Sequence, residues 1–165
     1  MRLSHLPLRV ATGAFILNAG LGKLSADDET AKGLHGMATG TYPFLQKAEP
    51  KVFVKGLAIS EIVVGASLLS PFVSPLLAGG ALAGFSGGLL RMYLKTPGMT
   101  RQDGVRPSQQ GTPLAKDVWM FGIGLSLVID ALSPRRKRHR VRSAKRSVKA
   151  AAGAGAAKAA QAVAH

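Results

Sequence analysis

Four stretches of mostly apolar residues, separated by polar or turn-rich segments, dominate the first 132 residues of the chain. They cover residues 6–24, 52–70, 75–94 and 114–132. Each approaches the roughly 20 residues that an α-helix needs to cross the hydrocarbon core of a bilayer. The pattern therefore predicts an all-α fold, an integral membrane four-helix bundle occupying residues 1–132.

The first apolar stretch follows a basic start, so a cleaved secretory signal peptide is an alternative interpretation. The best cleavage position, after Ala26, has Leu24 where a small residue is wanted. We therefore favour an uncleaved first span, flanked by Arg2 and Arg9 at one end and by Lys23 at the other.

The segment between the first two spans, residues 25–51, is polar and mixed. Ser25 and Asp28 have the spacing of a capping box, and acidic residues suit the positive end of a helix dipole. We expect a short helix at the membrane interface over residues 26–38, ended by Gly40 and Pro43.

Small residues form regular stripes in the apolar stretches. The third span has two stripes at four-residue spacing, which contain Gly80, Gly84 and Gly88 in one and Gly79, Ala83 and Gly87 in the other. Small residues let membrane helices approach closely. We expect helix packing at Gly65, Gly80, Gly84 and Gly88, and the stripes also favour a homo-oligomer.

Glu61 lies near the middle of the second span, on one face with Ala58, Gly65 and Leu68. A charged side chain there costs about 2.5–3.5 kcal/mol, so it normally faces protein or water. We expect an intramembrane polar cluster containing Glu61 with Asn18, Lys23, Lys55, Arg91, Lys116 and Asp117. Glu61 should pair with Arg91 or Lys116, and Arg91 is preferred because its planar fork matches a carboxylate.

The alternative is that these polar residues have no binding role and are only solvated or paired within the bundle. The basic side chains could extend to the outer headgroups, and Asp117 could be solvated at its helix start. Glu61 is too short to do so and needs an internal partner or a proton. The cluster is then either a stabilising feature of the bundle or a ligand or proton site.

The basic character of the chain comes mostly from its end. Ten of its 22 Lys and Arg residues follow Pro134, in a stretch without Asp or Glu, and they dominate the net charge of +14. Residues 133–165 predict a disordered, Ala-rich cytoplasmic tail, and four spans place the N-terminus on the same side of the membrane. Anionic lipid should contact the tail at Arg135, Arg136, Lys137, Arg138, Arg140 and Arg142. Nucleic-acid binding is less favoured, since no aromatic residue interleaves these charges.

The sequence has no cysteine, no zinc-ligand spacing, no phosphate loop and no Ser/His/Asp order. We therefore expect no catalytic residue and no metal site. Any redox activity would depend on a bound cofactor or on a partner protein.

The order of short motifs resembles the DoxX-like family of bacterial and archaeal membrane proteins. Arg9 opens the first span and Gly-x-x-Lys-Leu closes it at residues 20–24. The second span reads G-L-A-x-x-E-x-x-x-G-x-x-L-L over residues 56–69, Arg91 ends the third, and Lys116 with Asp117 opens the fourth. The resemblance covers residues 6–132 and leaves out the tail.

The resemblance implies a small multi-pass protein of the bacterial inner membrane. Some relatives are quinone-reducing subunits in thiosulfate oxidation, and others associate with superoxide dismutase and a sulfurtransferase. By analogy, we expect an accessory or quinone-associated subunit of a redox or oxidative-stress complex, with Glu61, Arg91 and Lys116 shaping an outer polar pocket. The alternatives are a non-enzymatic scaffold or small-molecule permease and, more weakly, a membrane tether with a nucleic-acid-binding tail.

Overall fold

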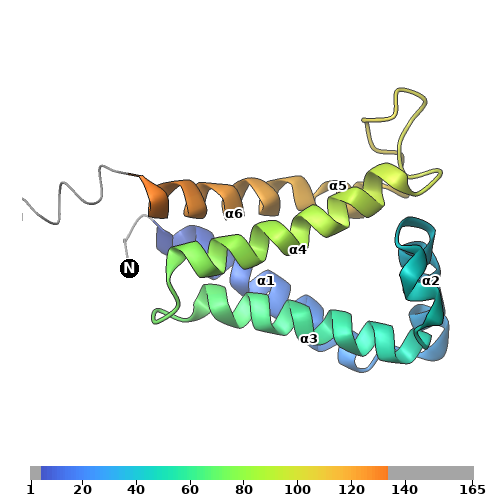
Figure 1. Cartoon of the computed structure of the whole chain (residues 1–165), viewed down its shortest axis with the longest axis horizontal. Coiled ribbons are helices and arrows are strands. Elements are labelled where there is room, and N and C mark those ends of the chain that lie inside the picture. Colours follow the sequence, from blue (N-terminus) through green and yellow to red (C-terminus); the bar gives the residue numbers. More distant parts are fainter. Residues whose placement is uncertain (1–4, 134–165) are drawn as a thin grey trace, which may run out of the picture. The chain divides into compact units, whose positions relative to one another are not determined.

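The computed structural model describes residues 5–133, which form helices and no β-strand (Figure 1). The order is α1 (Leu6–Leu24), α2 (Asp28–Thr41), the 3-10 helix η2 (Pro43–Lys47), α3 (Pro50–Leu69), α4 (Pro75–Lys95), α5 (Thr112–Ala115) and α6 (Asp117–Leu132). The predicted all-α class is confirmed. The chain divides into two units, residues 1–128 and 129–165; the packing described below lies within the first. The tail residues expected to contact anionic lipid lie outside the described residues.

Prolines and a serine set the starts of the long helices. A proline occupies the first or second position of α1, α3 and α4, where its missing N–H costs nothing. Ser74 caps α4, because its Oγ accepts a hydrogen bond from the backbone N–H of Leu77 at 3.2 Å. These local signals explain why α1, α3 and α4 begin within two residues of the predicted positions.

The helix after α1 begins later than expected. Its N-cap is Asp27, whose Oδ1 accepts a hydrogen bond from the backbone N–H of Thr30 at 2.8 Å. Hydrogen bonds from the side chain and backbone of Thr30 lower the pKa of Asp27. The hydroxyl of Ser25 instead donates to Gly22 O at 3.3 Å, so Ser25 ends α1 and does not open α2.

The fourth apolar stretch is not one continuous helix. A short helix, α5, ends at Ala115, and α6 begins at Asp117. Lys116 lies at the break and is exposed, whereas its neighbour Asp117 is buried. Adjacent helical residues point about 100° apart, so only one of these two ionisable residues enters the interior.

α1 and α3 pack with their backbones in near contact. A Cβ added at Gly65 of α3 would lie 2.7 Å from the backbone nitrogen of Leu17 and 2.8 Å from Gly13 O. A Cβ added at Gly20 of α1 would lie 2.8 Å from Ala58 O. The expected packing role of Gly65 is thus seen between these two helices. The core beside this contact contains Ile16, Val64, Leu68, Ala78, Leu82 and Leu127.

α4 uses the other of its two small-residue stripes to pack. A Cβ at Gly79 would lie 2.8 Å from Gly124 O of α6. A Cβ at Gly80 or Gly84 would have no atom of another part of residues 5–133 within 4 Å. A Cβ added at Gly88 would lie 3.7 Å from the hydroxyl of Tyr42 and, within residues 5–133, would meet no backbone of another helix. The expectation that Gly80, Gly84 and Gly88 pack helices within the chain is therefore corrected. Adjacent helical residues point about 100° apart, so two neighbouring stripes cannot face the same helix.

We predict opposite effects for two glycine-to-alanine substitutions. Gly65→Ala should lower the free energy of unfolding by about 1–3 kcal/mol, because the methyl group overpacks against the backbone of α1. Gly80→Ala is the matched control, and it should leave stability unchanged or raise it by up to ~1 kcal/mol through helix propensity. Denaturant titration followed by circular dichroism measures both, and equal effects would contradict the packing described here.

Candidate functional site

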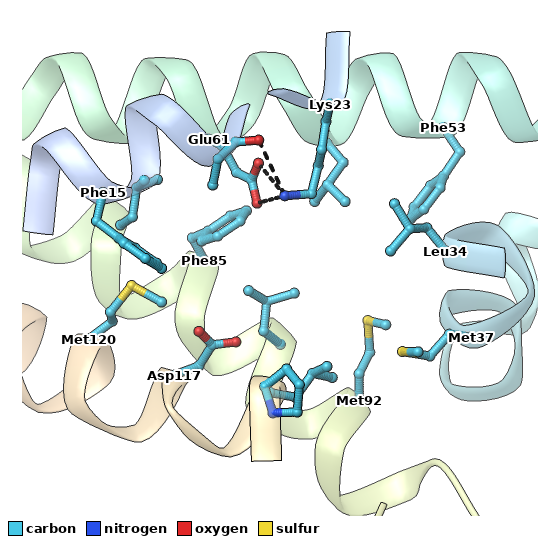
Figure 2. Close-up of a pocket in the computed structure, with 16 residues that line it drawn as sticks. Phe15, Lys23, Leu34, Met37, Phe53, Glu61, Phe85, Met92, Asp117 and Met120 are labelled. Carbon is cyan, nitrogen blue, oxygen red and sulfur yellow. Dashed lines mark hydrogen bonds and ion pairs between the residues drawn. The ribbon is translucent and has the colours of Figure 1, made fainter. Parts of the chain in front are cut away.

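An ion pair joins the end of α1 to the middle of α3. The Nζ of Lys23 lies 2.9 Å from Glu61 Oε2 and 3.0 Å from Oε1, and it also donates to Ala19 O at 3.4 Å (Figure 2). The side chain of Glu61 is 8% exposed and that of Lys23 is 25% exposed. The carboxylate is therefore held inside the helix packing, and its cation lies closer to the surface.

The face of α3 that carries Glu61 is the buried one, as its spacing predicts. Ala58, Glu61, Gly65 and Leu68 are all buried. Gly20 is the neighbour of this face on α1, since a Cβ added there would lie 2.9 Å from the Cβ of Glu61. Lys23 follows Gly20 by three residues, which brings its side chain to the same side of α1.

A cavity of about 280 Å³ opens beside this ion pair. Residues from α1, α2, α3, α4 and α6 line it, and most of them are apolar. Aromatic rings and methionines contribute much of the wall, from Phe15, Phe53, Phe85, Met37, Met92 and Met120 (Figure 2). The sequence analysis did not single out these six residues as a site, because they come from five helices that only the tertiary structure brings together.

Asp117 is the third ionisable side chain of the cavity. It is 6% exposed, and Figure 2 draws it on the opposite side of the cavity from Lys23 and Glu61. Residues 5–133 offer its carboxylate no hydrogen bond or ion pair. Asp117 therefore lies at a helix start, as expected, but faces the cavity and not the outer surface of the helices.

The structure corrects the partner expected for Glu61. Arg91 is exposed, and its guanidinium lies over the ring of Tyr42, 5.4 Å from the centroid. Arg91 follows Gly88, whose carbonyl accepts a hydrogen bond from the hydroxyl of Tyr42 at 3.0 Å. This face of α4 is directed at the end of α2, where Arg91 contacts Tyr42, and Glu61 pairs with Lys23 instead.

Three more members of the expected cluster lie elsewhere. Asn18 is exposed on α1, and Lys116 is exposed at the break between α5 and α6. Lys55 is exposed on α3 and lines a separate cavity with Lys51 and Ala31. Of the seven residues expected to form one polar cluster, Lys23, Glu61 and Asp117 are brought to the same cavity.

The chemistry that these three groups offer is binding through charge and hydrogen bonds. No group of three or more His, Cys, Asp and Glu side chains suited to a metal ion occurs in residues 5–133. Three acceptors lie within hydrogen-bond distance of the Lys23 ammonium, namely both carboxylate oxygens of Glu61 and Ala19 O. Within residues 5–133, Asp117 is the ionisable side chain of the lining that has no hydrogen bond or ion pair. Comparisons of the chain with protein-family models, curated proteins and solved structures give no significant match.

Proposed function

We propose that this chain is a four-span membrane protein that binds a small, mainly apolar molecule between its helices. The supporting observation is the inverted distribution of polarity on α3. Glu61 is 6% exposed, whereas Ile59 and Val63 are 56% and 59% exposed. A water-soluble bundle would place these residues the other way round, because apolar burial stabilises it and charge burial costs energy.

The outer faces of the other long helices support the same placement in lipid. Leu21 on α1 is 52% exposed, Leu77 on α4 is 68% exposed and Trp119 on α6 is 71% exposed. Contiguous exposed apolar surface on a soluble monomer is rare and marks contact with protein or membrane. Here it accompanies a buried Arg9 and a buried Glu61, which favours lipid as the surroundings.

Within residues 5–133, α3 is the one helix whose length and composition suffice for a membrane span, with 20 residues and a mean hydropathy of 1.9. A third of that segment is buried, which is low for the core helix of a soluble protein. α1 contains Arg9 and Lys23, which lower its hydropathy but are satisfied inside the bundle. α6 has 16 residues, so a span there needs α5 as well. We include all four helical segments as spans on this reasoning.

The charge distribution of the chain favours one orientation in the membrane. The ten basic residues after Pro134 favour a cytoplasmic C-terminus, and four spans return the N-terminus to that side. We propose the bacterial inner membrane, with the Lys23 end of α1 toward the outside. Anionic lipid is the proposed partner of the tail, and nucleic acid is disfavoured for the reason given above.

The polar groups of the cavity bear on the choice of function. A quinone, the cofactor that the DoxX-like resemblance implies, has two carbonyl acceptors and needs hydrogen-bond donors. The ammonium of Lys23 is already occupied, and Asp117 could donate only when protonated. We therefore favour a small-molecule permease or binding protein, and place second the accessory subunit of a redox or oxidative-stress complex.

One purification tests the membrane and the ligand together. The tagged full-length protein should remain in the membrane pellet after alkaline carbonate extraction, since its spans are held by lipid. Mild detergent should then release it with a small organic molecule that mass spectrometry detects. Release by carbonate would overturn the membrane proposal. Recovery of a quinone with stoichiometric redox proteins would favour the second candidate.

A further inference from the structure

Asp117 is a buried carboxylate that lacks a partner in the described part of the chain. Its residue is 6% exposed and lines the 280 Å³ cavity. In Figure 2 its carboxylate rises from α6 into the space that separates it from Lys23 and Glu61. An ionised carboxylate at such a site costs several kcal/mol unless a positive donor reaches it. The position therefore suits a ligand that supplies this donor.

The charges that line the cavity do not balance. Glu61 and Lys23 form a pair in which the ammonium contacts both carboxylate oxygens. Asp117 adds a second carboxylate to the same lining, and residues 5–133 contribute no second basic residue to it. Lys116, the neighbour of Asp117, is exposed and outside the lining. With all three groups ionised, the cavity carries one uncompensated negative charge.

The walls suit the apolar body of an organic cation. Phe15, Phe53 and Phe85 present aromatic rings, whose faces attract cations. The methionine side chains of the wall are polarisable and adapt to ligands of irregular shape. The cavity has roughly twice the volume of the ~150 Å³ engineered cavity that binds benzene. A compact hydrocarbon cage or a small ring system therefore fits.

We infer that the cavity binds a lipophilic amine in its cationic form. The ammonium N–H groups donate to the Asp117 carboxylate, and the hydrocarbon body contacts the phenylalanine and methionine wall. This inference rests on the proposed function and specifies its ligand class. The Lys23–Glu61 pair keeps the opposite wall neutral, so the ligand's charge is drawn to Asp117.

Two probes of the same shape distinguish the contribution of the positive charge to binding from that of the hydrocarbon body. Adamantylamine is a cation at neutral pH, and adamantanol carries a neutral hydroxyl on the same cage. Isothermal titration calorimetry on the full-length protein in lipid nanodiscs measures both, with empty nanodiscs subtracted. We expect the amine to bind at least about tenfold more tightly than the alcohol, which corresponds to one favourable ionic hydrogen bond.

Variants of Asp117 test whether this residue causes the preference for the amine over the alcohol. Asp117→Asn should bring the two affinities to within about twofold of each other, whereas Asp117→Glu, which keeps the charge, should retain most of the preference. Glu29→Gln is the control, because Glu29 is exposed on α2 and does not line the cavity. Circular dichroism and size-exclusion profiles confirm that each variant is folded.

The outcomes distinguish this inference from the proposed function. Equal binding of amine and alcohol by the unaltered protein would overturn the cation preference and leave the apolar cavity in place. A preference that survives Asp117→Asn would overturn the role of Asp117. If neither probe binds, the amine inference fails, and the carbonate extraction still decides separately whether the chain is an integral membrane protein.

Discussion

Arg9→Leu should destabilise the bundle by about 3–5 kcal/mol, although the substitution replaces a cation by an apolar residue in an apolar helix. Arg9 is fully buried in the first turns of α1. Its Nε donates to Leu68 O at 2.7 Å, and its Nη2 donates to Ser67 O and Ser70 O, each at 2.8 Å. Each buried acceptor left without a donor costs about 1–3 kcal/mol.

The acceptors of Arg9 explain why this cation is tolerated inside the bundle. They include the last carbonyl groups of α3, which have no partner within the helix and carry its negative dipole end. Nη1 also donates to Val73 O at 3.2 Å, in the turn between α3 and α4. Arg9 therefore fastens α1 to the α3–α4 hairpin, although its position at the start of a span suggested only a flanking charge.

Two variants, Arg9→Lys and Arg91→Leu, are the controls for Arg9→Leu. Arg9→Lys should recover only part of the stability, because a single ammonium cannot reach all four carbonyl groups with the geometry of a guanidinium. Arg91→Leu should cost only about 0.5–1 kcal/mol, the value of an exposed cation–π contact. SDS titration and thermal unfolding in detergent measure all three variants. A small effect of Arg9→Leu, similar to that of Arg91→Leu, would contradict the capping role.

Glu61→Leu should destabilise the protein by about 2–4 kcal/mol, because it leaves the ammonium of Lys23 without its counter-charge. Breaking a buried ion pair costs about 3–5 kcal/mol. We expect a value toward the lower end because the side chain of Lys23 is 25% exposed and can turn toward water or headgroups. Glu61→Gln keeps the shape and should show a smaller loss of the same kind.

The double variant Lys23→Met with Glu61→Leu separates a structural pair from a binding pair. Removing both charges together should restore most of the stability lost in Glu61→Leu, since an apolar replacement of a buried pair is often neutral or stabilising. A double-mutant cycle from thermal unfolding gives the coupling between the two residues. Additive losses would show that they do not interact. A stable double variant that no longer binds adamantylamine would assign the pair to the ligand site.

Much of the local structure could be predicted from the sequence. The first apolar stretch matches α1 at both ends, and the starts of α3 and α4 follow proline and serine signals. The burial of Glu61 followed from its three- and four-residue spacing with small and apolar neighbours. The cap of α2 was misplaced because Ser25 and Asp27 are both good capping residues, and the choice depends on where α1 ends.

The partners of these residues could not be predicted in the same way. Arg91 was preferred for Glu61 on side-chain chemistry, yet Lys23 lies there because Gly20, three residues earlier, lets α1 approach α3 closely. The Gly20-x-x-Lys23 spacing was a signal that could have indicated this. No comparable signal separated Lys116 from Asp117, which are adjacent on the chain but differ in burial.

The sequence by itself determined the helical class, the approximate helix boundaries and the buried face of α3, because periodicity and capping depend on residues a few positions apart. Only the tertiary structure decided that Lys23 pairs with Glu61, that Arg9 caps α3 and that Asp117 lines a cavity in which no other residue of the described range 5–133 pairs with it. These outcomes depend on how each helix is shifted and rotated against its neighbours. Many small packing contacts set that register together, and none of them can be read from a single segment of the chain.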